Sequence, residues 1–109
     1  MTKPVTIIAE VAQGFEGDES LARLLARGAS AAKADAVKFQ LVYADELATP
    51  QYDYYGFFRQ LELTDVAWSK VADEAQQLGL ALMFDVFGLR SMSLAQRLGA
   101  SAVKIHTTD

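Results

Sequence analysis

The stretch Ala36–Val42, AVKFQLV, is a short apolar run that only two polar side chains interrupt. It lacks the clean alternation of a strand with one face in water, so we expect a strand covered on both faces, as in a parallel sheet. Three more segments have the same character and are also predicted as strands: Val5–Ala12, Leu80–Phe87 and Ala102–Thr107.

Helical patterns separate these strands. Apolar residues recur at helical spacing over Glu19–Lys33, where Asp18 can cap the first turn. A second helix is predicted over Thr64–Leu78, with Gly79 just past its end, and a shorter one over Leu89–Leu98. Strand and helix therefore alternate, which predicts an α/β fold whose parallel strands are joined by crossover helices.

The segment Tyr43–Leu63 breaks this alternation. It contains Pro50 and a cluster of five aromatic residues, and it shows little helical period before Phe57. Loops of this length are often functional. We expect the segment to be irregular, and its aromatic side chains to cover one end of the sheet rather than to contact a substrate directly. The cluster comprises Tyr52, Tyr54, Tyr55, Phe57 and Phe58.

Composition excludes several classes of protein. The chain has 109 residues, of which 51% are hydrophobic and 22% charged, as in an ordinary globular protein. A net charge of −4 argues against nucleic acid or an anionic membrane surface as a partner. Without cysteine the chain can form neither disulfides nor thiolate metal sites, and no apolar run approaches the roughly 20 residues that span a bilayer. A cytoplasmic location is the expectation.

The length also bears on the architecture. A doubly wound sheet of this size would normally end on a covering helix, whereas here the fourth predicted strand runs almost to Asp109. A complete (β/α)₈ barrel needs about 250 residues. We therefore expect residues 1–109 to form the N-terminal half of a TIM barrel, with about four parallel strands and three helices.

Polar side chains interrupt the predicted strands near their C-terminal ends, where parallel α/β folds and barrels build their active sites. Two lysines and a glutamate that meet at one end of the sheet would suit a small polyanion. The alternative is a structural ion pair between Glu10 and Lys38 beside a lysine that reaches solvent. Because such groups occur in all four strands, we expect a functional site, formed by Glu10, Lys38, Gln40, Asp85, Lys104 and His106.

Several short segments resemble one known family in order and spacing. These are IIAEV, EGD, ADAVKFQ, LEL and AVKI, at Ile7–Val11, Glu16–Asp18, Ala34–Gln40, Leu61–Leu63 and Ala102–Ile105. Together they resemble the sialic acid (N-acetylneuraminate) synthase family over the whole chain, and the ADAVKFQ block is the most specific of them.

The resemblance implies a (β/α)₈ barrel that condenses phosphoenolpyruvate with an N-acyl amino sugar aldehyde and releases phosphate. The product would be a nine-carbon 2-keto sugar acid. The resemblance implies that Lys38, Gln40 and Lys104 hold phosphoenolpyruvate and that Glu10 lies near the reacting carbons. Thr107 stands where the family has a serine that contacts phosphoenolpyruvate. A manganese or magnesium ion and a homodimer are implied for the full-length protein, with two histidines of later strands as the metal ligands.

The chain departs from the family pattern in three places. The family's Asn-His-x-Gly is replaced by Gly14–Gly17, its Ser-Thr-Pro-Phe by Phe84–Phe87, and its Gly-Ser-Gly-Glu by His106–Asp109. Asp85 thus stands in place of a threonine that donates to phosphoenolpyruvate. It can either pair with a lysine or face the sugar. We expect the second, because the changes at Gly14 and Phe15 also fall on the sugar side.

Two other functions remain open at this point. Lys104 or Lys38 could be the nucleophile of a Schiff-base aldolase, if burial lowers its pKa. Alternatively, the chain could be a non-catalytic half-barrel whose exposed edges pair with a second copy or another protein.

Overall fold

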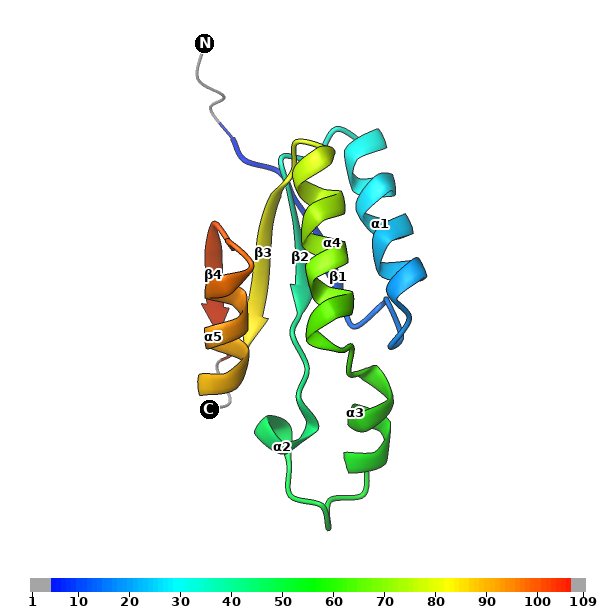
Figure 1. The fold of residues 1–109 in the computed structure, drawn as a ribbon, viewed down its shortest axis with the longest axis vertical. Coiled ribbons are helices and arrows are strands. Elements are labelled where there is room, and N and C mark those ends of the chain that lie inside the picture. Colours follow the sequence, from blue (N-terminus) through cyan, green and yellow to red (C-terminus); the bar gives the residue numbers. More distant parts are fainter. Residues whose placement is uncertain (1–4, 107–109) are drawn as a thin grey trace.

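One parallel sheet of four strands runs through the computed structural model, which describes residues 5–106 (Figure 1). All three strand pairings are parallel, and the strands follow one another across the sheet in chain order. The predicted parallel sheet is confirmed, with strands shorter than expected. They are β1 (Ile8–Ala12), β2 (Ala36–Gln40), β3 (Ala81–Val86) and β4 (Ala102–Ile105).

Three helices correspond to the predicted ones: α1 (Glu19–Ala31), α4 (Asp65–Gln77) and α5 (Leu89–Arg97). The first two begin at the expected caps, because Asp18 accepts a hydrogen bond from the backbone of α1 and Thr64 from that of α4. Figure 1 shows α1 and α4 side by side on one face of the sheet. Within the described part of the chain, no helix is long and apolar enough to cross a bilayer.

An aromatic cluster joins these helices to the sheet. Trp68 on α4 is fully buried, and its ring meets those of Phe15, Phe39 and Phe84 edge-on, with centroids 5.2, 5.6 and 5.3 Å away. Because neighbouring residues of a strand point to opposite faces, Phe39 and Phe84 on the helix side direct Lys38, Gln40 and Asp85 to the other side. The buried core thus determines which face carries the polar side chains.

The segment between β2 and α4 is more regular than expected, because helices form before Phe57 as well as after it. It forms two short helices, α2 (Ala44–Leu47) and α3 (Tyr55–Leu61), which bring the described residues to five helices. Helices this short are unstable alone and need tertiary contacts. One such contact is made by Glu62, whose carboxylate accepts a hydrogen bond from the backbone nitrogen of Ala44 at 2.8 Å.

The aromatic residues of this segment do not cover the end of the sheet, which corrects a second expectation. Tyr52 is 51% exposed, and Tyr54 and Phe57 are also half or more exposed. The rings of Tyr52 and Phe58 stack on each other, with centroids 6.2 Å apart and an interplanar angle of 12°. Tyr52 and Phe58 line an open pocket instead of sealing the sheet.

The loop after β1 also differs from expectation. Phe15 was placed on the sugar side, yet its side chain is fully buried against Trp68 on the helix side. Gly17 follows with a left-handed φ of +71°, and a Cβ there would lie 1.9 Å from the carbonyl oxygen of Gln60. The lack of a side chain at Gly17 lets the loop lie close to α3. The burial of Phe15 against Trp68 indicates that the replacement at this position serves packing.

Candidate functional site

The face of the sheet opposite the aromatic cluster carries the polar residues predicted from the sequence. The strand register pairs Glu10 with Lys38, Gln40 with Asp85, and Asp85 with Lys104. Residues paired in a parallel sheet point to the same face, so these five form one continuous polar surface. The structure therefore brings the predicted strand residues together near the C-terminal ends of their strands.

Lys38 lies at the centre of this surface, with 15% of its side chain exposed. Its ammonium is 3.0 Å from Glu10 Oε1 and 3.2 Å from Asp85 Oδ1. Partial burial lowers the pKa of Lys38, but the contacts with Glu10 and Asp85 outweigh that effect and raise the pKa above its usual value. Lys38 is therefore held as a cation between two carboxylates.

Asp85 pairs with this lysine, which corrects the expectation that it faces the sugar. Only 5% of its side chain is exposed. Its Oδ1 atom is buried and makes no hydrogen bond to the described residues, so the contact with Lys38 is electrostatic. The reason is position: Asp85 lies on β3 diagonally across from Lys38, two residues beyond Met83, which is the direct partner of that lysine. The cost of burying a carboxylate favours a nearby cation as its partner.

Lys104 is the second cation of the surface. It is exposed on the edge strand β4 and forms no ion pair with a residue in the range 5–106. Its backbone is in register with Asp85, so its ammonium can approach the same space from the other side. Thr107, the remaining predicted contact, lies outside the described residues. The surface thus combines one lysine that is already paired with one that is available to an anion.

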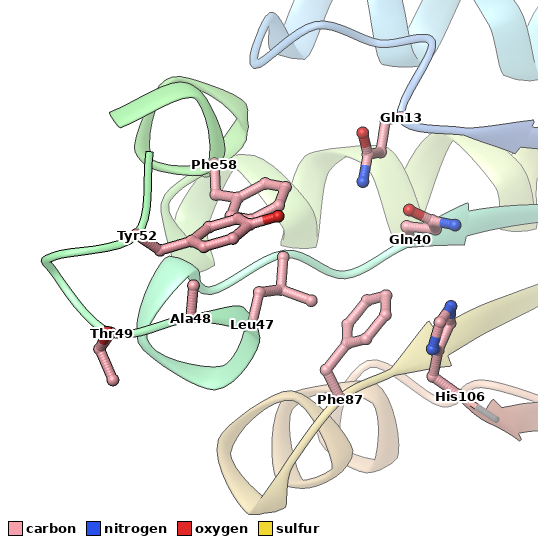
Figure 2. Close-up of a pocket in the computed structure, with 9 residues that line it drawn as sticks. All are labelled: Gln13, Gln40, Leu47, Ala48, Thr49, Tyr52, Phe58, Phe87 and His106. Carbon is pink, nitrogen blue, oxygen red and sulfur yellow. The ribbon is translucent and has the colours of Figure 1, made fainter. Parts of the chain in front are cut away.

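A pocket of about 430 Å³ adjoins this surface, in the size range of small-molecule sites (Figure 2). Figure 2 shows the stacked rings of Tyr52 and Phe58 on one side of the pocket and the side chains of Gln13, Gln40 and Phe87 on the other. The pocket is lined by Gln13, Gln40, Leu47, Ala48, Thr49, Tyr52, Phe58, Phe87 and His106.

His106 and Phe87 form the wall of the pocket on the side of β3 and β4. Their ring centroids are 5.2 Å apart. Sequence reasoning missed Gln13 and Phe87, although a usable signal existed. Each comes directly after the last residue of a strand, β1 or β3, where the side chains of a barrel site are expected.

The opposite wall is held by contacts between α2 and α5. The Glu46 carboxylate on α2 accepts hydrogen bonds from the backbone nitrogens of Arg90 and Ser91, at 2.9 and 3.3 Å. A carboxylate at this position also interacts favourably with the N-terminal end of the helix dipole. Glu46 approaches Gly88 so closely that a Cβ there would lie 2.3 Å from its Oε2 atom. The contact positions Leu47, the residue that follows Glu46 on the pocket wall.

Tyr43 also helps to hold this wall in place. Its hydroxyl donates to Asp65 Oδ1 at 2.9 Å, and the Arg90 guanidinium lies 3.8 Å from the centre of its ring. Burial, followed by the hydrogen bond to Asp65, raises the pKa of Tyr43 to about 12 from an ordinary 10.0.

This pKa predicts an alkaline loss of stability. A pKa raised in the folded state stabilises the fold fully below the unfolded-state pKa near 10 and loses that contribution as pH rises toward 12. We expect the free energy of unfolding of the wild type to fall more steeply between pH 10 and 12 than that of Tyr43→Phe. Urea unfolding across this range measures both slopes, and identical slopes would contradict the assignment.

The resemblance implies a divalent ion whose ligands are histidines of later strands, outside this chain. Between residues 5 and 106 there is no group of three histidine, cysteine, aspartate or glutamate side chains that could hold a metal. Glu10 and Asp85 are both within ion-pairing distance of Lys38.

Comparisons with known proteins find one matching family and a related sequence. A family model described as the NeuB family matches residues 25–109. An uncharacterized protein of Methanocaldococcus jannaschii is 26% identical over 98% of the chain, which covers 32% of that relative.

Solved structures show the same fold. The N-acetylneuraminic acid (sialic acid) synthetase of Leptospira borgpetersenii, in complex with citrate, superposes with a TM-score of 0.86 at 24% identity over 94% of this chain and 36% of its own. The spore coat polysaccharide biosynthesis protein SpsE of Bacillus subtilis gives a TM-score of 0.72 at 28% identity, over 94% of this chain and 29% of its own. The chain thus spans about a third of the length of the proteins it matches, and its α/β fold corresponds to the N-terminal half of their barrels.

Proposed function

Because the chain belongs to the NeuB family, we propose that it contributes the anion-binding half of a barrel enzyme that condenses phosphoenolpyruvate with an N-acyl amino sugar aldehyde. The product is a nine-carbon 2-keto sugar acid of nonulosonic acid biosynthesis. The remaining strands of the barrel would come from the rest of a longer protein, because the chain spans about a third of its relatives.

The observation that carries this proposal is the arrangement of Lys38 and Lys104 around Asp85. Lys38 is a cation held by Glu10 and Asp85, and Lys104 is exposed one strand farther on. A phosphorylated enol acid carries two anionic groups, and two lysines on one face can neutralise both. The acidic side chains beside Lys38 orient it but also reduce the positive charge of the site.

The reaction needs positioning more than covalent help from the protein. Carbon C3 of phosphoenolpyruvate forms a bond to the aldehyde carbon, whose oxygen takes a proton. Water then adds to C2 and gives up both of its protons, one to balance the proton taken by the aldehyde oxygen and one to the departing phosphate. The bond from C2 to the phosphate oxygen breaks, which releases inorganic phosphate and leaves the 2-keto group. Lys38 and Lys104 hold the enol phosphate, and Glu10, which is 46% exposed, is placed to orient the water or the sugar.

A Schiff-base aldolase is the weaker alternative. An imine requires a neutral amine, which enzymes obtain by lowering the pKa of a lysine. Here the two carboxylates raise the pKa of Lys38 instead. Borohydride in the presence of a keto acid should leave both lysines unmodified, whereas a covalent adduct at Lys38 or at Lys104, the other candidate nucleophile, would favour the aldolase.

The experiment that tests the proposal compares this chain with the full-length protein that contains it. We expect the full-length protein to release phosphate from phosphoenolpyruvate only when an N-acyl amino sugar such as N-acetylmannosamine is present. The 109-residue chain should release none, because four strands leave the barrel open. Steady phosphate release by the chain alone would contradict this assignment, as would a full-length protein that leaves phosphoenolpyruvate intact with every N-acyl amino sugar supplied.

A further inference from the structure

A single carboxylate joins the segment after β2 to the helix after β3. We propose that Glu46 is a positioning residue for the condensation, because it caps α5 from another part of the chain and thereby fixes Leu47 and Phe87 beside the lysines. Glu46 itself does not line the pocket. The inference rests on the proposed function, since it adds to that reaction a residue that acts through its neighbours.

Helix α5 has no cap of its own. Its N-cap residue is Gly88, which has no side chain to accept a hydrogen bond from the first turn. Glu46 takes this role from α2: its Oε2 atom accepts from the backbone nitrogens of Arg90 and Ser91, at 2.9 and 3.3 Å. The negative charge suits the position, because the N-terminal end of a helix dipole is positive. The start of α5 therefore depends on a residue of a distant segment.

Gly88 is fitted to this carboxylate by its size and not by its backbone conformation. Its φ of −177° is extended backbone that any residue can adopt. A Cβ at this position, however, would lie 2.3 Å from Glu46 Oε2 and 2.7 Å from Glu46 Cδ. The missing side chain thus leaves the space that the carboxylate occupies. Two positions far apart in the sequence are matched to make one contact.

The contact closes a frame of two segments, residues 41–47 after β2 and residues 85–91 at the end of β3 and the start of α5. At one end of the frame, the backbone nitrogen of Leu41 donates to the carbonyl oxygen of Asp85 at 3.0 Å. At the other end, Glu46 holds the first turn of α5. Because both ends are joined, the two segments keep a fixed separation between them.

The frame includes two side chains of the pocket wall, Leu47 and Phe87 (Figure 2). Phe87 is 8% exposed, and its ring contacts that of His106, which lies two residues beyond Lys104. The position of α5 is thereby transmitted to the strand that carries the second lysine. Condensation is sensitive to such positions, because a displacement of about 1 Å can cost a hundredfold in rate. Glu46 is therefore expected to act on the rate of the reaction.

The test compares phosphate release with phosphoenolpyruvate binding in the full-length protein. Glu46→Ala should lower kcat about tenfold, because the pocket wall loses its fixed position. The Kd for phosphoenolpyruvate should not change, since Lys38 and Lys104 remain on their strands. Glu46→Gln should lose less activity, because its amide oxygen can still accept from a backbone nitrogen of α5. A general loss of folded protein would not separate kcat from Kd in this way.

Gly88→Ala tests the same contact from the other side. Its Cβ displaces the carboxylate, so it should lower kcat as Glu46→Ala does. It should have no further effect once Glu46→Ala has removed the carboxylate, which makes the two changes non-additive. Asp18→Ala is the matched control, because Asp18 also caps a helix with a carboxylate, that of α1, and does not line the pocket. It should leave kcat unchanged.

Hydrogen exchange of the ligand-free protein gives a measurement that needs no substrate. In Glu46→Ala, exchange of the Arg90 and Ser91 amides should become about fivefold faster, while that of β2 stays the same. Equal kcat in the wild type and Glu46→Ala, an equal loss in Asp18→Ala, additive effects with Gly88→Ala, or unchanged exchange would each overturn the inference. A wild-type protein that releases no phosphate counts against the proposed function instead, and the exchange rates then decide alone whether Glu46 holds α5.

Discussion

Replacing Lys38 with methionine is expected to weaken phosphoenolpyruvate binding about tenfold to a hundredfold in the full-length protein, because a charge-assisted contact is worth roughly 1.5–3 kcal/mol. Methionine keeps the length and the apolar stem of the side chain but removes the ammonium. The variant also leaves Glu10 and Asp85 next to the anion without the cation that now neutralises them. Direct titration with phosphoenolpyruvate measures the change.

Two further variants show whether the loss of binding is specific to the proposed anion site. Lys104→Met should weaken binding to a similar degree, because Lys104 is the second cation in the proposed site. Lys70→Met, on the exposed face of α4, removes the same charge elsewhere and should have no effect. If either sheet variant binds phosphoenolpyruvate as the wild type does, the anion site is assigned incorrectly. Lys38→Met combined with Asp85→Asn controls for destabilisation by a buried carboxylate that has lost its partner.

The second expected result concerns Asp85, which stands where the resembled family has a threonine. Asp85→Thr should tighten phosphoenolpyruvate binding about tenfold, because a buried negative charge 3.2 Å from the Lys38 ammonium competes with the ligand for that cation. Lys38 keeps its contact with Glu10 in the variant, so the lysine stays in place. Titration at constant ionic strength measures the gain, and the KM for the sugar should not change.

Charge and shape can be separated at this position. Asp85→Asn removes the charge but keeps the size of the side chain, so a similar gain in both variants would identify charge as the cause. Asp73→Asn, an exposed site on α4, removes one carboxylate far from the sheet and is the matched control. Unchanged phosphoenolpyruvate binding in the two Asp85 variants, with a raised KM for the sugar, would instead show that Asp85 acts on the acceptor.

The sequence alone was sufficient for the elements that have a clear repeat. The apolar runs of β1 to β4 and the helical patterns of α1, α4 and α5 were all predicted, and the period of two within a strand placed Lys38 with Gln40 and Phe39 opposite. It was not sufficient for α2 and α3, which have four and seven residues. Helices that short hold few turns in which a repeat could appear, and contacts such as that of Glu62 with Ala44 stabilise them.

In the site, the sequence predicts how residues of one strand are arranged, but it does not predict contacts between residues of different strands. Which side chains share a face follows from the pleat of each strand, a local property that can be counted along the chain. The partner of Asp85 depends on the register between β2 and β3 and on how deeply its carboxylate is buried. No single segment of the sequence determines either of these. Phe15 is a similar case, because only the packing of α4 against the sheet brings Trp68 to it. Long-range packing thus sets the ion pair and the pocket wall, since both join residues that are distant in the chain.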